Sequence, residues 1–154
     1  MGVRLTEEEA WEMLARSHTG IITTLRRDGW PISLPMWFAV VDRKIYMRTL
    51  AASKKALRIK HDQRACFMVE SGEAWKDLAA VVIPVRASLI DADSAEARQA
   101  LAVLGAKYQG FGLPRQQVPE ATKKHYGAGN VVIRLEAAGG MITWNNAKIR
   151  LKSA

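Results

Sequence analysis

The chain has a single cysteine and few histidines, and both shortages narrow the chemistry open to it. Cys66 cannot form an intramolecular disulfide, which fits a reducing, cytoplasmic location. His18, His61 and His125 lack the spacing of zinc ligands, so no metal site is predicted. Hydrolase and P-loop motifs are absent, and no Asp or Glu pair is placed for acid–base catalysis. If the protein is an enzyme, we expect a cofactor to carry the reaction.

Long apolar runs are missing as well. No stretch of the 154 residues is apolar enough to cross a bilayer, so no membrane partner is expected. The acidic, polar start of the chain is unlike a signal peptide. Residues 1–154 are predicted to form one domain, because this length suits a single hydrophobic core.

Acidic residues are few, with 15 Asp and Glu against 23 Lys and Arg, and most of the resulting excess of positive charge lies in one segment. Residues 43–64 hold eight Lys and Arg and one acid, Asp62, a net charge of +7 out of +8 for the chain. Such a segment can bind nucleic acid, an anionic membrane or an anionic small molecule. Because helix-turn-helix, zinc-finger and RNA-binding patterns are absent, an anionic small molecule is expected and nucleic acid is not.

Patterning predicts a mainly β (α+β) chain with a few short helices. Thr6 and Glu9 form a capping box that begins a helix ending near Ser17. Successive hairpins favour an antiparallel sheet, and about seven strands in this length would curl into a barrel. The strands are predicted at 20–25, 31–41, 44–49, 65–70, 79–90, 130–136 and 141–144, and the later helices at 53–61, 94–108 and up to residue 126.

The basic segment crosses a predicted strand-to-helix junction. Arg48 and Thr49 end the strand, and Ser53 is the predicted N-cap of the helix. A helix N-terminus offers free N–H groups and partial positive charge to a phosphate. Spacings of three and four bring further cations to one helical face, namely Lys54, Lys55 and Arg58. A solvated basic face is the alternative, but the coincidence of strand end, hydroxyls, N-cap and cations favours a phosphate site.

The stretch 31–38 carries a second candidate feature. Pro35 has no N–H to give to a sheet ladder, so this strand is predicted to lie at a sheet edge or to face something other than a strand there. A flat ligand against the exposed backbone would explain the stretch. An edge strand with a buried Trp37 explains it equally well, and the residues alone leave both interpretations open.

Together these segments resemble the pyridoxamine-phosphate-oxidase-like split β-barrel superfamily. The closer similarity is to its branch of small actinobacterial reductases that use a flavin or the deazaflavin coenzyme F-420. The resemblance rests on 19–25, Asp28-Gly29, 31–38, Arg48-Thr49, Ser53-Lys54-Lys55, 59–70, Gly72, Trp75, 81–91, Trp144 and Lys148. It implies an antiparallel split β-barrel that forms a homodimer, with the cofactor at the subunit interface.

The resemblance also implies roles for individual residues. The phosphate would be held by Arg48, Thr49, Ser53, Lys54 and Lys55, with Arg58 on the same basic helix. The ring would be lined by Ser33, Leu34, Pro35, Met36 and Trp37, and flanked by Trp75 and Trp144. No catalytic residue is identified, and the candidate proton donors are Lys148 and Tyr126.

The chain departs from the superfamily pattern at three places. Gln63 stands where proline is common, and Pro84 where glycine is more usual. The pyridoxine-phosphate oxidases carry a substrate-binding arginine shortly before the C-terminal tryptophan, and residues 140–143 contain none. Pyridoxine phosphate is therefore not the expected substrate.

The leading hypothesis is an oxidoreductase that uses F-420 to transfer a hydride to a planar organic acceptor. The phosphodiester and glutamates of F-420 would match the +7 segment better than a single phosphate does. An FMN-dependent oxidoreductase of the same fold is the alternative. A non-enzymatic carrier of flavin or haem is a third possibility, and the sequence leaves the three open.

Overall fold

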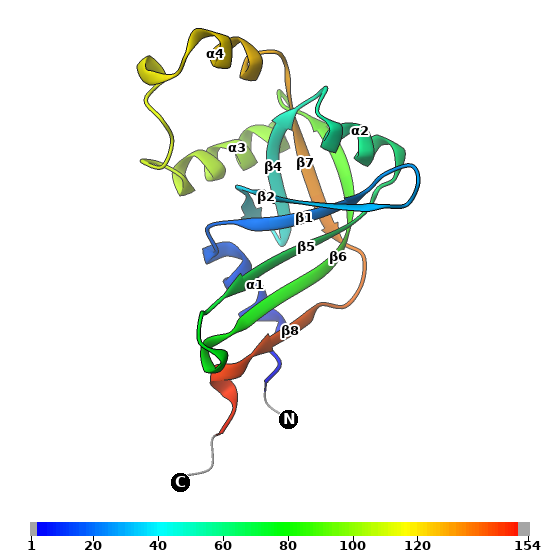
Figure 1. Cartoon of the computed structure of the whole chain (residues 1–154), viewed down its shortest axis with the longest axis vertical. Coiled ribbons are helices and arrows are strands. Elements are labelled where there is room, and N and C mark those ends of the chain that lie inside the picture. The colour runs from blue at the N-terminus through cyan, green and yellow to red at the C-terminus, as the bar shows by residue number, and fades with distance from the viewer. Residues whose placement is uncertain (1–2, 151–154) are drawn as a thin grey trace.

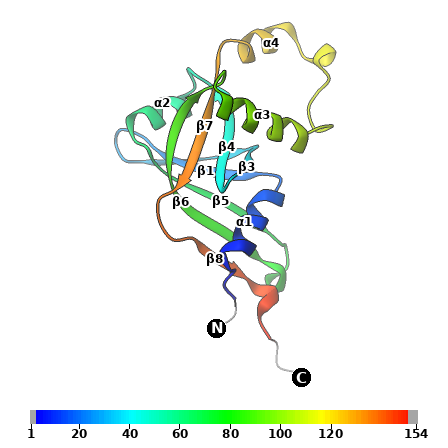
Figure 2. The same cartoon turned by 180° about the vertical axis from the view of Figure 1, so that it is seen from behind.

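One antiparallel sheet of eight strands forms the body of the chain in a computed structural model that describes residues 3–150 (Figures 1 and 2). The strands are β1 (Gly20–Leu25), β2 (Pro31–Met36), β3 (Ala39–Val41), β4 (Lys44–Leu50), β5 (Arg64–Ser71), β6 (Ala79–Asp91), β7 (Asn130–Ala137) and β8 (Ile142–Asn145). The α-helices of this part of the chain are α1 (Glu7–Arg16), α2 (Lys54–His61), α3 (Ala95–Lys107) and α4 (Glu120–Tyr126). Short 3-10 helices occur at Trp75–Asp77, Arg115–Gln117 and Asn146–Lys148.

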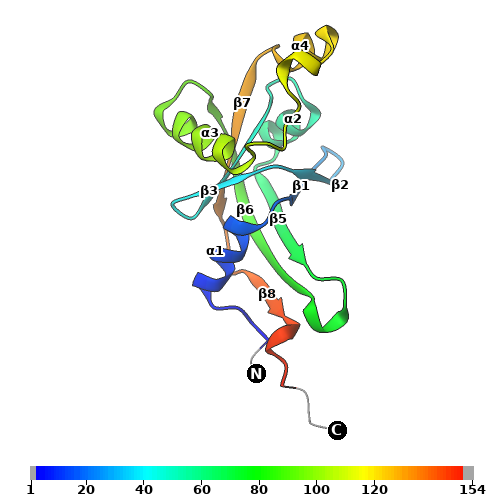
Figure 3. The same ribbon diagram turned by 90° about the vertical axis from the view of Figure 1, so that its left-hand side faces the viewer.

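The strand order shows that the sheet curls on itself. It runs β2-β1-β5-β6-β7-β4-β3, and β8 pairs with the first part of β6. The two outermost strands, β2 and β3, are consecutive in the chain and are separated only by Trp37 and Phe38. The two edges of the sheet therefore come together, which makes a barrel that is split between β2 and β3 (Figure 3). This is the predicted antiparallel split barrel.

The single strand predicted over 31–41 is wrong, because this stretch forms two strands with different partners. β2 pairs with β1, whereas β3 pairs with β4. The change of partner falls at Trp37 and Phe38, and the Phe38 side chain turns into the core against Phe67. Apolar residues continue to alternate through the break, so periodicity alone does not reveal it.

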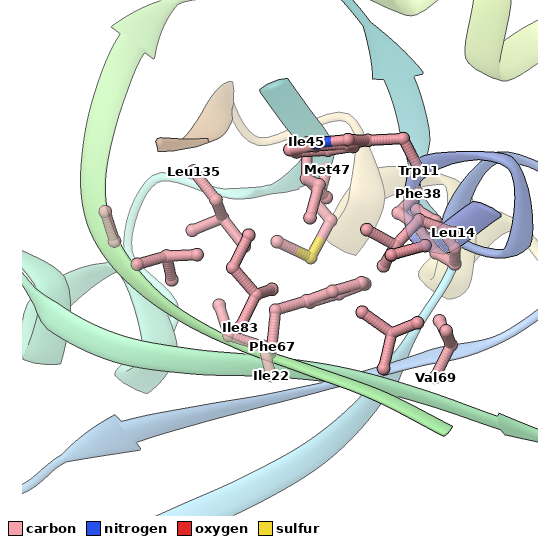
Figure 4. Packing of buried hydrophobic residues seen from close by; sticks show 14 of the residues in the cluster. Trp11, Leu14, Ile22, Phe38, Ile45, Met47, Phe67, Val69, Ile83 and Leu135 are labelled. Atoms are coloured by element: carbon pink, nitrogen blue, oxygen red, sulfur yellow. The ribbon is translucent and has the colours of Figure 1, made fainter. Parts of the chain in front are cut away.

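The interior of the barrel is filled by side chains from the sheet and from α1 (Figure 4). The capping box at Thr6 is confirmed, since its Oγ1 accepts from the Glu9 N–H at 3.2 Å. Gly20 is required by close packing, because a Cβ there would lie 2.1 Å from Cζ of Phe67. The core residues shown are Trp11, Leu14, Ile22, Phe38, Ile45, Met47, Phe67, Val69, Ile83 and Leu135.

Pro84 lies inside β6 at a place where its missing N–H costs no ladder bond. Along one side, β6 pairs with β8 over residues 79–82 and with β7 over 85–91. Pro84 falls in the gap between these partners, and its carbonyl accepts from the Ala138 N–H at 2.9 Å. A proline is tolerated in this long strand because the gap leaves no partner for its N–H.

The C-terminal end of α3 closes the split between β2 and β3. The Tyr108 hydroxyl accepts from the Phe38 N–H at 2.9 Å, and it can donate to the carbonyl of His18 at 2.7 Å or of Phe38 at 3.1 Å. Lys107 Nζ donates to the same Phe38 carbonyl at 3.1 Å and lies 3.8 Å from the centre of the Phe38 ring. Burial lowers the pKa of Lys107 to about 8. Side chains thus satisfy backbone groups that a neighbouring strand would otherwise bond.

Replacing Tyr108 with phenylalanine should lower the free energy of unfolding by about 1–3 kcal/mol, because the buried Phe38 N–H loses its acceptor. Urea unfolding followed by circular dichroism measures the change. Tyr126→Phe is the matched control, since Tyr126 is 62% exposed, and it should change stability by no more than about 0.5 kcal/mol. Equal values for the two variants would show that the Phe38 N–H does not depend on Tyr108.

Candidate functional site

A groove of about 890 Å³ lies among the end of β2, β4, α2, α3 and the segment that carries α4. Its volume falls in the range of small-molecule sites in proteins, about 300–1,000 Å³. We call it the central groove. Its lining residues are Met36, Trp37, Arg48, Thr49, Leu50, Ser53, Lys55, Leu104, Gly105, Tyr108, Gly112, Leu113, His125, Tyr126 and Asn130.

Four polar residues of the groove, Arg48, Thr49, Ser53 and Lys55, come from the junction between β4 and α2, and we call them the polar cluster. The predicted N-cap is confirmed, since Ser53 Oγ accepts from the Ala56 N–H at 3.2 Å. Thr49 Oγ1 lies 3.2 Å from Ser53 Oγ, and Lys55 Nζ donates to Thr49 Oγ1 at 3.3 Å. Two hydroxyls and two cations thus meet beside a helix N-terminus, which is the donor set that a phosphate needs.

The central groove carries positive charge without a compensating acid, since none of its lining residues is Asp or Glu. Burial, followed by the nearby charge of Arg58, holds the pKa of Lys55 below its ordinary value. A bound anion would offset both effects, because it favours the charged form of the lysine. The electrostatics of the groove therefore fit an anionic ligand.

Lys54 and Arg58, which the sequence also assigned to the phosphate, do not line the central groove. They line a second hollow of about 630 Å³ with Arg26 and Arg27 of the β1–β2 turn. Arg58 Nε also donates to Thr24 Oγ1 at 2.8 Å, which fixes the guanidinium over β1. An adjoining hollow shares Arg27 and Arg58 and adds further basic residues of α2. We call this region the outer basic surface, comprising Arg26, Arg27, Lys54, Arg58 and Lys60.

The predicted ring-binding strand reaches the groove only at its end. β2 lies at the edge of the sheet, as Pro35 predicted. Met36 and the following Trp37 line the groove. Ser33 Oγ bonds instead with Thr23 Oγ1 at 2.8 Å, and Leu34 packs against the core. A part in ring binding for Ser33, Leu34 and Pro35 stays a prediction.

β8, which carries Trp144, lies at the opposite end of the molecule from α2, α3 and α4, which border the central groove (Figure 1). The 3-10 helix that follows β8 ends at Lys148, and Asn146 Nδ2 of that helix donates to the carbonyl of Trp75. Lys148 Nζ is 2.6 Å from a carboxylate oxygen of Glu9, and it donates to the Arg4 carbonyl at 3.3 Å. The bond to Lys148 lowers the pKa of Glu9. Lys148 thus links the 3-10 helix at Asn146–Lys148 to α1. Of the two candidate proton donors, Tyr126 lines the central groove and Lys148 does not.

Several lining residues were not predicted from the sequence, among them Leu104, Tyr108, Leu113 and His125. A signal existed for Tyr108, because it extends by one helical turn the apolar stripe of α3 that ends in Leu104. No local sequence pattern shows that the segment after α3 returns to the groove. That placement depends on contacts between distant parts of the chain.

Two further features bear on the class of protein. Within residues 3–150, no three His, Cys, Asp or Glu side chains come close enough to hold a metal ion. In the same range, no helix is long and apolar enough to cross a membrane.

This geometry defines the class of protein: a split barrel with a groove that suits an anionic ligand. The sequence matches the family model of pyridoxamine 5′-phosphate oxidase over residues 6–136, and the chain therefore belongs to that family. The superfamily predicted from the sequence is thereby confirmed. No curated protein matches the chain.

Solved structures share the fold over nearly the whole chain. A conserved hypothetical protein from Mycobacterium tuberculosis is 25% identical with a TM-score of 0.78, covering 99% of this chain and 93% of that one. A FAD-binding protein from Mesorhizobium loti is 19% identical with a TM-score of 0.69, covering 93% and 97%. The haem storage protein HutZ from Vibrio cholerae is 15% identical with a TM-score of 0.68, covering 90% and 94%.

The lowered pKa of Lys55 predicts how phosphate binding depends on pH. A phosphate held by Lys55 would need the charged lysine. Affinity for FMN should therefore be constant below the pKa of Lys55 and fall as the pH rises through it, and the fall should begin below the ordinary value of 10.5. The Lys55→Arg variant should keep its affinity over the same range, because a guanidinium stays protonated. Titration calorimetry from neutral pH to about 9.5 measures both proteins. A parallel fall in both would assign the titration to another group.

Proposed function

We propose that the chain is an oxidoreductase that binds coenzyme F-420 in the central groove and transfers a hydride to a planar organic acceptor. The observation that carries the proposal is the extent of positive charge. It continues from the polar cluster over α2 to the outer basic surface. The family and the geometry of the groove support a cofactor with a phosphate and a flat ring.

The polar cluster suits the phosphate of such a cofactor. Arg48 and Lys55 would supply charge, and Thr49 and Ser53 would supply hydroxyl donors, beside the first turn of α2. Met36 and Trp37 would contact the ring from the end of β2. The bound coenzyme in its reduced form supplies the hydride.

The outer basic surface favours F-420 over FMN. The single phosphate of FMN would be matched by the polar cluster alone and would make no use of the charges of Arg27, Lys54, Arg58 and Lys60. Arg26 is partly neutralised by Asp28 at 2.8 Å. A phosphodiester followed by glutamates carries several negative charges along its length and would use both regions.

In the proposed reaction the residues of this chain would orient the cofactor and the acceptor and would exclude water. The groove walls from α3 and from the segment before α4 supply Leu104 and Leu113, which would shield the ring from solvent. Tyr126 also lines the groove and is the candidate proton donor to the acceptor.

Two alternatives have support from relatives of the same fold. The FAD-binding protein favours a flavin, and the haem storage protein favours a carrier. The absorbance spectrum of the purified protein distinguishes them. A bound flavin or haem spectrum would support the alternatives. A colourless protein that quenches the fluorescence of added F-420 would support the proposal.

Single substitutions test which cations hold which part of the cofactor. Arg48→Ala and Lys55→Ala should each weaken binding of F-420 and FMN by about ten- to hundredfold, since a charge-assisted bond to phosphate contributes about 1.5–3 kcal/mol. Lys54→Ala should weaken binding of F-420 and leave FMN unchanged, because Lys54 lines only the outer basic surface.

Titration calorimetry with both cofactors measures these affinities. Arg98→Ala is the matched control, since Arg98 is exposed on α3 and lines neither the central groove nor the hollows of the outer basic surface. Tighter binding of FMN than of F-420 by the unaltered protein, with no effect of Lys54→Ala on either, would replace the proposal with the FMN alternative.

A homodimer is part of the proposal. Large apolar side chains are exposed far from the groove, among them Trp75, Ile142 and Trp144. A second copy of the chain would cover such area, and its Trp75 and Trp144 would then be able to flank the groove. Sedimentation velocity at micromolar concentration should give twice the chain mass of 17.1 kDa. A purely monomeric species would contradict this assembly.

A further inference from the structure

The connection between α3 and β7 stands away from the sheet and carries α4 (Figures 1 and 2). We call residues 112–128 of this connection the α4 segment. Neither α4 nor the 3-10 helix at Arg115–Gln117 has a buried residue. The segment nevertheless lines the central groove, through Gly112, Leu113, His125 and Tyr126. It thus forms a wall of the groove without belonging to the core.

Hydrogen bonds hold the α4 segment to itself and not to the sheet. Its backbone bonds join near neighbours, as when the Gln117 N–H donates to the Pro114 carbonyl at 2.8 Å. Within residues 3–150, the only hydrogen bonds that reach the segment from outside come from Gly129 and Asn130, the two residues that follow it. A segment with few buried contacts and only local bonds can change position at a low cost in free energy.

The two ends of the α4 segment are suited to act as hinges. Gly110 and Gly129 have φ angles of 86° and 88°, in the left-handed region that glycine enters at little cost. The body of the molecule is contacted beside each glycine. The Phe111 ring lies 4.7 Å from that of His18, and the Gly129 carbonyl accepts from the Ala51 N–H at 3.1 Å. The ends are therefore anchored, whereas the residues between them are not.

Apolar surface on the α4 segment favours movement toward the groove. Leu113 is 73% exposed and Tyr126 is 62% exposed, although both line the groove. Leu104 and Met36 line the same groove from α3 and β2. If the segment moved over a bound ligand, these exposed side chains would lose contact with water, which is favourable.

Charge makes this movement depend on an anion. Lys123 and Lys124 lie in the last turn of α4, and only Lys123 forms an ion pair within the segment, with Glu120 at 3.2 Å. The groove adds Arg48 and Lys55 and has no acid among its lining residues. Like charges on the segment and the groove repel each other, and an anion bound between them would attract both.

We propose that the α4 segment is a lid that closes over an anionic ligand in the central groove. Closing turns the backbone near Gly110 and Gly129 and brings Leu113 and Tyr126 over the ligand. The proposal rests on the proposed function for the nature of the ligand, a phosphorylated flavin-type cofactor. It adds that a moving part of the chain encloses the cofactor and sets the rate at which the cofactor leaves.

Hydrogen exchange read by mass spectrometry tests the movement in the full chain. Without ligand, the amides of residues 112–128 should exchange at least about a hundredfold faster than those of β7. Saturating FMN or F-420 should slow exchange about tenfold across residues 115–124. These residues do not line the groove, so direct contact with the ligand would not protect them. The β3–β4 turn at Asp42–Arg43 also lies outside the groove lining and should not change.

Stopped-flow fluorescence tests the closed position through Leu113→Ser. The variant should release FMN or F-420 about tenfold faster and change the association rate by less than about twofold, because the lid acts after the ligand has entered. Circular dichroism should show an unaltered fold, since Leu113 is exposed. Val103→Ser is the matched control, because Val103 is an exposed apolar residue of α3 that does not line the groove.

The outcomes separate the lid from the proposed function. If neither FMN nor F-420 binds the unaltered protein, both proposals fall. If a cofactor binds and exchange in residues 115–124 is not slowed, or Leu113→Ser does not hasten release, the lid is overturned while cofactor binding stands. Exchange in residues 112–128 as slow as in β7 without ligand would overturn the lid by itself.

Discussion

The structure depends on how the chain passes from one edge of its sheet to the other. β2 and β3 are the outermost strands, and two residues join them. At such a crossing the backbone has no strand to bond, and an unpaired buried N–H is costly. The Tyr108 hydroxyl supplies the missing partner for Phe38. The Tyr108 side chain, together with Lys107, thereby bridges the split, and Tyr108 also lines the groove.

The same crossing explains why the candidate site lies where it does. Trp37 lies at the split, where it is 40% exposed and its ring is stacked on that of Tyr108. The neighbouring β4–α2 junction adds the polar cluster to the same groove. The exposed ring of Trp37 and the N-terminus of α2 thus come together because β4 pairs with β3, the strand that follows the split.

Membership of this family narrows the chemistry expected of the chain, but it does not identify the ligand. The family is that of a phosphorylated-vitamer oxidase, while structures of the same fold include a FAD-binding protein and a haem storage protein. One barrel thus serves several flat ligands, and the groove residues of each chain decide among them. In this chain the proposed ligand rests on positive charge that extends beyond the polar cluster, over Lys54 and Arg58.

Local features were predictable from the sequence by itself. The capping box at Thr6, the N-cap at Ser53 and the edge position of the strand with Pro35 each depend on one short stretch, and all three are confirmed. The concentration of charge in residues 43–64 and the antiparallel barrel were also readable, because composition and hairpin order need no distant contacts.

Only the tertiary structure decided which of these residues meet. The break at Trp37 is invisible to periodicity, because the apolar alternation runs through it while the strand partner changes. Lys54 and Lys55 are neighbours in the sequence, yet Lys55 lines the central groove and Lys54 lines a hollow of the outer basic surface. They separate because successive residues of a helix point about 100° apart. Tyr108 and Phe38 are 70 residues apart in the sequence, and they meet because the sheet curls on itself. Patterns along the chain determine elements, and the packing of distant elements determines the site.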